Sequence, residues 1–334
     1  MTMHYFSSVG RMAPSKTRLR RSCLAVPGSN PKMMQRAAER GADQIFLDLE
    51  DAVAPNEKEA ARSNVVEALN TYDYGDTVVT VRVNDATTPY MYGDIIELLR
   101  GAGGRFDCIM VPKVADAGQL WFVEHLMNQL EADLQADVRH GWEVQIETGT
   151  GSVNMTEIAR VSDRIECLIF GPGDYAADMG IPQLDLGMLE PAFPGYQWTY
   201  VVSQIVNTAR SVGADAIDGP HGDYRDADGF RDMATRAKLL GMDGKWCIHP
   251  SQIELANEAF TPTKEQFEYA TGLLEAYDAA TTAGRGAVTY EGKMIDEASR
   301  KMAEKLVLRG RAAGIDVERT DPRHSTPIGH LDPA

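Results

Sequence analysis

Short apolar runs alternate along the chain with longer segments in which apolar residues recur every three or four positions. The short runs fit strands that are buried on both faces, and the longer segments fit amphipathic crossover helices. This alternation predicts repeated strand–helix units around a buried parallel sheet. The eight predicted strands are Ser22–Val26, Gln44–Leu49, Val78–Val83, Cys108–Val111, Trp142–Ile146, Cys167–Phe170, Ala214–Ile217 and Lys245–Ile248.

Eight strands with helices between them favour an α/β fold of the closed (β/α)8, or TIM, barrel type. An open doubly wound sheet is the structural alternative. In a barrel, the carboxyl ends of the strands form the catalytic face. The predicted crossover helices include Pro31–Arg40, Glu57–Leu69, Tyr92–Arg100, Ala117–Leu134, Trp198–Val212 and Asp228–Leu240.

The pattern changes after Pro262, where a long helical segment, Lys264–Ala283, leads into a glycine-rich hinge at residues 284–286. A final helix is expected to end near Gly310. We interpret this region as a small helical appendage rather than a ninth unit. The predicted division is an N-terminal extension (residues 1–20), the catalytic barrel (21–262), a helical lid segment (263–315) and a flexible tail (316–334).

The overall charge restricts the kind of partner. The 334 residues carry 33 Lys and Arg against 49 Asp and Glu, which gives a formal net charge of −16. Because a phosphate backbone attracts a basic surface, this balance argues against a nucleic-acid partner. An anionic substrate would then need local positive charge from arginines or a metal ion.

The chain also lacks the signs of a membrane or secreted protein. No run approaches the roughly 18 apolar residues of a membrane span, and residues 1–21 are polar and basic without an apolar signal region. The four cysteines are far apart in short apolar runs, which is neither a zinc spacing nor a disulfide framework. We expect a cytoplasmic protein with no membrane partner, in which Cys23, Cys108, Cys167 and Cys247 are small buried residues.

Two acidic residues directly follow neighbouring predicted strands. Glu147 follows the fifth strand and Asp174 follows the sixth, so in a barrel their carboxylates would stand side by side at the rim. Two carboxylates with open positions for water and substrate oxygens suit a hard cation such as Mg²⁺. The alternative for each residue is capping of the helix that it precedes.

Arg82 ends the third predicted strand, where an apolar run would not normally finish with a cation. Its guanidinium could hold a carboxylate or stabilise a developing enolate oxygen, or it could simply pair with a nearby acidic cluster. That cluster, Asp48, Glu50 and Asp51, could bind metal, orient Arg82 or be solvated, and we favour the orienting role. His249, at the end of the eighth strand, is either a neutral donor or a structural histidine.

Several motifs resemble those of the citrate-lyase-beta-like (CitE-like) superfamily. They are Val26-Pro-Gly-Ser29, the stretch from Phe46 to Val53, Val111-Pro-Lys113, the Glu147 motif and Gly173-Asp174. Further motifs resemble the malyl-CoA lyase group (L-malyl-CoA/beta-methylmalyl-CoA lyase type) within it. These are residues 218–223, 229–231, 240–250 and 255–262, and the resemblance extends from about Arg21 to Gly310.

The resemblance implies a Mg²⁺-dependent lyase, with Mn²⁺ as a substitute, that cleaves (S)-malyl-CoA reversibly to acetyl-CoA and glyoxylate. Beta-methylmalyl-CoA, which yields propionyl-CoA and glyoxylate, is a second expected substrate. The same resemblance implies homo-oligomers, trimers or hexamers, in which the C-terminal segment of one subunit covers the active site of its neighbour. Alternatives are a citramalyl-CoA lyase, a malate synthase or malyl-CoA thioesterase, a citrate lyase beta-type subunit, and a CoA-thioester-binding protein without activity.

The resemblance also assigns residues. Glu147 and Asp174 would bind the metal, Arg82 would hold the reacting oxygens, and Asp296 would be the acid/base supplied by the adjacent subunit. Relatives often have an arginine that binds CoA phosphates at the position of Asn30, and Arg36, one helical turn later, could share that task. The positions that fall where the family contacts substrate or CoA are Ala25, Asn30, Arg36, Arg82, Gly173, Asp174, Ile248 and His249.

Overall fold

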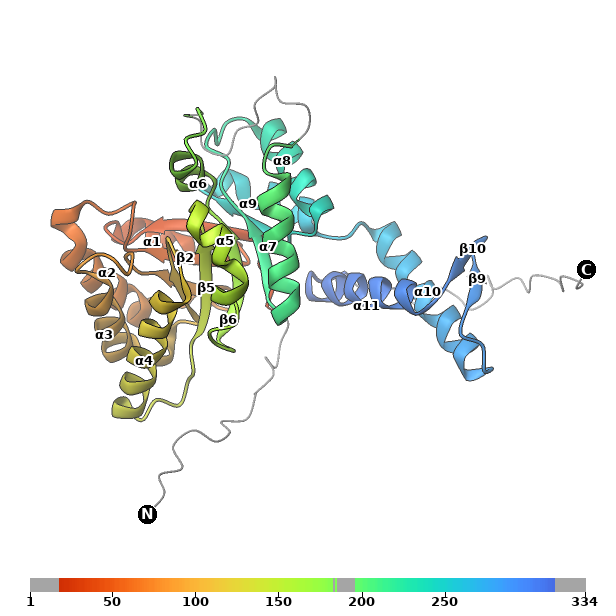
Figure 1. Ribbon diagram of the computed structural model, residues 1–334, viewed down its shortest axis with the longest axis horizontal. Coiled ribbons are helices and arrows are strands. Elements are labelled where there is room, and N and C mark those ends of the chain that lie inside the picture. Colours follow the sequence, from red (N-terminus) through yellow and green to blue (C-terminus); the bar gives the residue numbers. More distant parts are fainter. Residues whose placement is uncertain (1–17, 183, 185–195, 316–334) are drawn as a thin grey trace, which may run out of the picture. The chain divides into compact units, whose positions relative to one another are not determined.

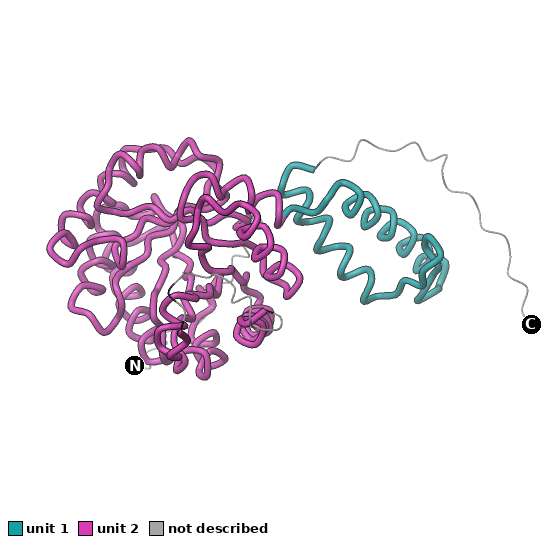
Figure 2. Tube along the Cα trace, turned by 90° about the horizontal axis from the view of Figure 1, so that it is seen from above, with its two compact units in different colours: residues 1–17, 261–334 teal, residues 18–260 magenta. Residues whose placement is uncertain are grey.

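The computed structural model describes residues 18–182, 184 and 196–315 (Figure 1). These residues fall into two compact units, a barrel unit of residues 18–260 and a C-terminal unit of residues 261–315 (Figure 2). The predicted tail from residue 316 and most of the predicted N-terminal extension lie outside the described residues.

In the barrel unit, eight parallel strands close into a barrel in sequence order, and the last strand pairs with the first. Ser22 of β1 lies opposite Lys245 of β8, so the open sheet is excluded and the predicted (β/α)8 barrel is confirmed. The strands are β1 Ser22–Pro27, β2 Gln44–Asp48, β3 Val78–Arg82, β4 Cys108–Val111, β5 Gly141–Ile146, β6 Ile165–Phe170, β7 Asp215–Asp218 and β8 Gly244–Cys247.

Helices cover the outside of the barrel (Figure 1). The predicted helix from Pro31 ends at Ala37 rather than Arg40, because Glu39 N and Arg40 N bond to carbonyls only three residues back. No described helix has the length and apolar composition needed to cross a bilayer. The helices of this unit are α1 Pro31–Ala37, α2 Lys58–Thr71, α3 Met91–Ala102, α4 Ala117–Leu134, α5 Gly149–Ile158, α6 Pro172–Asp178, α7 Thr199–Val212, α8 Ala227–Leu240 and α9 Ile253–Phe260.

Every second side chain of a barrel strand points into the lumen. Phe46 and Trp246 belong to a buried apolar cluster in the lumen, which also contains Cys23 and Cys167. A larger apolar core lies between the strands and the helices. Because Asp48 is two residues after Phe46 on β2, its side chain also points into the lumen, at the carboxyl end of the strand. The same alternation, taken on β3 and past the end of β5, places Arg82 and Glu147 at that end of the lumen.

Charged side chains, rather than apolar ones, close the amino-terminal end of the barrel. Arg20 Nε donates to Glu143 Oε1 at 2.9 Å, and other nitrogens of Arg20 contact Glu166 at 2.7 Å and Asp215 at 3.3 Å. The Arg20 and Glu143 side chains are buried, and burial of an ion pair requires such mutual partners. This end is therefore structural, which leaves the carboxyl ends of the strands for ligands.

The C-terminal unit contains helices α10 (Lys264–Thr282) and α11 (Glu297–Ala312), with a hairpin between them. The hairpin strands, β9 (Val288–Tyr290) and β10 (Lys293–Ile295), are antiparallel. They were not predicted. Their two-residue turn has φ of +44° at Glu291 and +76° at Gly292, as expected for a tight hairpin turn. The apolar core of this unit consists of Phe267, Ala270, Leu273, Tyr277, Ile295, Ala303 and Val307.

Candidate active site

Arg82, the last residue of β3, holds its guanidinium over the lumen cluster. Its Cζ lies 5.7 Å from the ring centroid of Phe46 and 5.4 Å from that of Trp246. Nε and Nη2 donate to the two carboxylate oxygens of Asp48 at 2.7 and 2.6 Å, and Nη1 lies 3.2 Å from Glu50 Oε2. Burial alone lowers the pKa of Arg82, but these carboxylates raise it above its ordinary value. The acidic cluster thus fixes a permanently charged guanidinium at the barrel mouth.

Asp48 has little capacity left for another ligand. Besides Arg82, its oxygens accept the backbone N–H groups of Glu50 at 2.8 Å and Ala52 at 3.0 Å. This arrangement fits the expected orienting role better than a metal-binding role. Asp51 was expected to orient Arg82 with the other two acidic residues, but its carboxylate contacts Lys113 instead, at 3.0 Å.

Glu147 lies just past the end of β5, and its side chain is almost fully buried. Its Oε1 accepts the backbone N–H of Lys113 at 2.7 Å, and its Oε2 accepts a hydrogen bond from the Gln145 side chain at 3.2 Å. Burial, reinforced by the charge of Asp174, raises the pKa of Glu147 to about 8. The capping alternative is wrong for Glu147, because Thr148 is the N-cap of α5 and accepts from Gly151 N at 2.9 Å.

Asp174 lies in the first turn of α6, three residues after its N-cap, Gly171. A carboxylate in the first turn of a helix is favoured by the backbone N–H groups there, although Asp174 does not cap the helix. Its side chain is 43% exposed and faces the ammonium of Lys113 at 3.7 Å. Asp174 therefore presents an accessible carboxylate beside the buried one of Glu147, whose pKa it raises.

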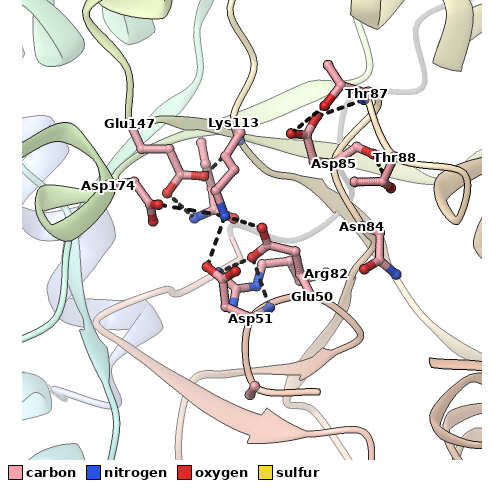
Figure 3. A network of polar contacts seen from close by, with 12 residues as sticks. Glu50, Asp51, Arg82, Asn84, Asp85, Thr87, Thr88, Lys113, Glu147 and Asp174 are labelled. Carbon is pink, nitrogen blue, oxygen red and sulfur yellow. Dashed lines mark hydrogen bonds and ion pairs between the residues drawn. The ribbon is translucent and has the colours of Figure 1, made fainter. Parts of the chain in front are cut away.

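Lys113 connects these groups, as Figure 3 shows. It follows β4, and its Nζ donates to Glu50 Oε1 and to Asp51 Oδ2. Burial alone lowers the pKa of Lys113, but its hydrogen bonds and charge interactions with the carboxylates raise it above its ordinary value. The amine is therefore protonated at neutral pH.

The remaining predicted contact residues lie in the barrel unit. His249 stacks on Tyr224 with ring centroids 4.5 Å apart, and its Nδ1 lies 2.9 Å from Ser251 Oγ. Asn30 accepts from Met33 N at 3.1 Å as the N-cap of α1. Asn30, Arg36, Ile248 and His249 are exposed, whereas Ala25 and Gly173 are half-buried.

Asp296 belongs to the C-terminal unit, where it caps α11. Its Oδ1 accepts from Ala298 N at 3.0 Å and from Ser299 N at 3.1 Å. The hydrogen bonds from Ser299 and Ala298 lower the pKa of Asp296 below its ordinary value. The four predicted catalytic and metal-binding residues are thus divided, with Arg82, Glu147 and Asp174 in one unit and Asp296 in the other.

The arrangement in the barrel unit can do two kinds of chemistry. Glu147 and Asp174 offer carboxyl oxygens to a cation, while Arg82 offers N–H groups to a substrate oxygen. A guanidinium has five N–H groups, and its contacts with Asp48 and Glu50 leave capacity for such an oxygen. Such a pairing of metal-binding oxygens with a fixed cation stabilises negative charge that develops during a reaction.

Two contributors to this site were not assigned roles from the sequence. Lys113 appeared there only as part of a motif, although its place at the end of the fourth strand was a usable signal. The second is Gly171, where a Cβ would collide with the Glu147 carboxylate. Gly171 therefore makes room for a side chain of the site itself.

Comparisons with known proteins agree with this arrangement. A model of the HpcH/HpaI aldolase/citrate lyase family matches residues 21–250. The L-malyl-CoA/beta-methylmalyl-CoA lyase of Cereibacter sphaeroides is 40% identical over 303 residues, which cover 88% of this chain and 95% of the relative. A malyl-CoA/beta-methylmalyl-CoA/citramalyl-CoA lyase of Chloroflexus aurantiacus is 34% identical and covers 79% of this chain and 80% of the relative.

A solved structure is also similar over most of the chain. Protein CitE of Mycobacterium tuberculosis, in complex with magnesium, acetoacetate and coenzyme A, has 29% sequence identity and a TM-score of 0.69. The similarity covers 88% of this chain and 98% of that one. The resemblance seen in the sequence motifs is thereby confirmed, and the chain belongs to the HpcH/HpaI aldolase/citrate lyase family.

Proposed function

We propose that this protein is a Mg²⁺-dependent carbon–carbon lyase that cleaves (S)-malyl-CoA reversibly to acetyl-CoA and glyoxylate. The observation that carries the proposal is the convergence of Arg82, Glu147 and Asp174 at one mouth of the barrel, in a chain 40% identical to a lyase of this name. Beta-methylmalyl-CoA is a second proposed substrate, because the same relative is named for it.

The donor set fits a hard divalent cation. Among the described residues no group of three or more His, Cys, Asp or Glu side chains could hold a metal, so the protein would supply two carboxylates, Glu147 and Asp174. Mg²⁺ commonly binds through one or two carboxylates and completes its octahedron with water and substrate oxygens. Mn²⁺ is the expected substitute, because it accepts the same oxygen ligands.

Each residue then has a defined task. When bound, the metal would supply a Lewis acid for the carbonyl of glyoxylate. Arg82 stabilises the oxygen of the thioester enolate, because its charge is fixed in place before the reaction begins. Asp296 exchanges a proton with the methyl carbon of acetyl-CoA.

The CoA contacts are a further part of the proposal. Gly173, Ile248 and His249 are proposed to contact substrate or CoA, together with Ala25 on β1. Asn30 is a weak candidate for phosphate recognition, because its side-chain oxygen is occupied by the α1 cap. The exposed Arg36 in the last turn of α1 is the better candidate, since a guanidinium pairs directly with phosphate oxygens.

We also propose that the protein works as a homo-oligomer, a trimer or hexamer, in the cytoplasm. In this proposal Asp296 acts on the active site of an adjacent subunit. Asp296 and Arg82 belong to different compact units of the chain, and the role of the C-terminal unit as a lid is part of the same proposal.

Product analysis tests the proposed reaction. Incubation with acetyl-CoA, glyoxylate and Mg²⁺ should yield intact malyl-CoA, whereas free CoA and malate would indicate a synthase or thioesterase instead. The relative from Chloroflexus aurantiacus makes citramalyl-CoA a second candidate substrate, so pyruvate should be compared with glyoxylate and propionyl-CoA with acetyl-CoA. Lack of Mg²⁺-dependent condensation with every combination would refute the proposal.

Metal affinity is expected to depend on pH through Glu147. Because the pKa of Glu147 is raised to about 8, a proton competes with the metal for this carboxylate below that pH. The dissociation constant for Mg²⁺ should therefore rise by about tenfold for each pH unit below 8 and level off above it. Calorimetry in buffers of different ionisation enthalpy would measure both the affinity and the proton released, and a flat profile from pH 6 to 8 would contradict the assignment.

A further inference from the structure

Lys113 contacts both acidic residues proposed to bind the metal, through different parts of the residue. Its backbone N–H donates to Glu147 Oε1 at 2.7 Å, and its side-chain Nζ lies 3.7 Å from Asp174 Oδ1. In Figure 3 the ammonium lies between Asp174 on one side and the Glu50–Asp51 pair on the other. A single residue thus connects the carboxyl group of Glu147, just past the end of β5, with that of Asp174 in α6.

The backbone of Lys113 is adapted to this double contact. Its φ of +50° lies in the left-handed region, which residues with side chains seldom adopt. Such conformations persist where the surroundings fix them, and they occur often at functional sites. Here the conformation is held by the hydrogen bond to Glu147 and by the ammonium contacts to Glu50 and Asp51.

The charges around Lys113 do not balance. The network of ion pairs joins the carboxyl groups of Asp48, Glu50, Asp51 and Asp174 to the cations of Arg82 and Lys113, and Glu147 lies beside it. With the Lys58 ammonium, which interacts with Asp48, Glu50 and Asp51 and donates to the carbonyls of Leu49 and Glu50, five carboxyl groups face three basic side chains. This excess of acidic groups can be neutralised by a divalent cation. In the metal-free protein the Lys113 ammonium is important instead, because it reduces the repulsion between the carboxylates.

We propose that Lys113 is a positioning residue and the resident counter-ion of the metal centre. In the metal-free protein its ammonium neutralises Asp174, while its N–H holds Glu147 in place. When a divalent cation binds, the ammonium gives up Asp174 and keeps Glu50 and Asp51. This inference rests on the proposed metal centre. It adds that the Lys113 ammonium competes with the metal for the carboxylate of Asp174.

The distances decide which contact is given up. The Asp174 contact, at 3.7 Å, is longer than the Asp51 contact of 3.0 Å and the hydrogen bond to Glu50. Asp174 is also 43% exposed, so water can solvate it when the ammonium leaves, whereas Glu50 is almost fully buried. Loss of the contact between the Lys113 ammonium and Asp174 therefore disturbs the network of ion pairs least.

Removal of the ammonium is expected to tighten metal binding. Lys113→Met and Lys113→Gln keep the N–H that holds Glu147 but remove the positive charge that competes for Asp174. In protein stripped with EDTA, both should bind Mn²⁺ at least about tenfold more tightly than the unmodified protein, by titration followed with electron paramagnetic resonance. Their metal-free forms should melt at lower temperature, with a larger rise on addition of Mn²⁺.

Two control variants separate charge from packing. Lys113→Arg keeps the charge and should bind Mn²⁺ much as the unmodified protein does. Lys264→Met removes an exposed lysine of α10 and should also leave the affinity unchanged. The inference is supported if Lys113→Met and Lys113→Gln bind Mn²⁺ more tightly and the two control variants do not. Loss of a purely structural residue would instead weaken Mn²⁺ binding.

The possible failures are distinguishable. If Lys113→Met and Lys113→Gln bind Mn²⁺ equally well or more weakly than the unmodified protein, the proposed role of Lys113 is refuted and the metal centre stands. If the unmodified stripped protein binds no Mn²⁺, the metal centre is refuted and the role of Lys113 with it.

Discussion

Replacement of Glu147 by glutamine is expected to lower kcat/KM for malyl-CoA cleavage by about a thousandfold or more, because Lewis-acid stabilisation by a bound metal is worth several kcal/mol. Asp174→Asn should have a similar effect. Both changes preserve side-chain shape, so packing around Gly171 and α6 should be retained. Turnover measured over a range of Mg²⁺ concentrations checks the prediction.

The thermal stability of Glu147→Gln shows whether a loss of activity reflects damage to the fold. The pKa of Glu147 is raised in the folded protein to about 8, so ionisation opposes folding as the pH rises above the ordinary carboxyl range. The neutral amide removes this opposition, and the metal-free variant should melt no lower than the unmodified protein at pH 8.5. Asp232→Asn, on the exposed surface of α8, is the matched control and should keep full activity. Near-normal activity of Glu147→Gln or Asp174→Asn would rule out the metal assignment.

The periodicity of the sequence was enough to predict the barrel and the place of three candidate site residues in it. Apolar runs of strand length identified all eight strands, and their number favoured the closed barrel over the open sheet that the structure excludes. Once the barrel is assumed, the residues that follow strand ends must lie at one mouth. Arg82, Glu147 and Asp174 were found in this way, and the structure brings them together.

The features that could not be predicted from the sequence depend on local backbone conformation, which the pattern of apolar and polar residues does not reveal. The role of Lys113 requires a left-handed backbone and a side chain that reaches Glu50 and Asp51, which follow β2, and neither feature leaves a periodic signal. The hairpin of β9 and β10 has strands of only three residues, too short for alternation to be recognised. The capping of α11 by Asp296 was not predicted, although the Asp-x-x-Ser spacing is compatible with an N-cap.

Asp296→Asn is expected to lower kcat by about a hundredfold to ten-thousandfold, the usual contribution of a general acid or base. Asparagine caps a helix about as well as aspartate, so the oxygen that accepts from Ala298 N and Ser299 N should remain and α11 should stay folded. The melting temperature of the variant should therefore match that of the unmodified protein. Asp296→Ala, which also removes the cap, is the comparison that shows how much stability the cap contributes.

A mixture of two inactive variants tests whether Asp296 acts on a neighbouring subunit. If it does, oligomers formed from equal amounts of Asp296→Asn and Glu147→Gln chains contain sites in which both residues are intact. After purification on both tags, about one third of the unmodified activity per site should be restored in mixed trimers, and about one quarter in mixed hexamers. Co-expression of the two variants with different affinity tags, followed by purification on both, provides the mixed oligomer. An absence of recovery in a verified mixed oligomer would show that Asp296 serves its own chain or takes no part in the reaction, while the metal ligands would be unaffected by that result.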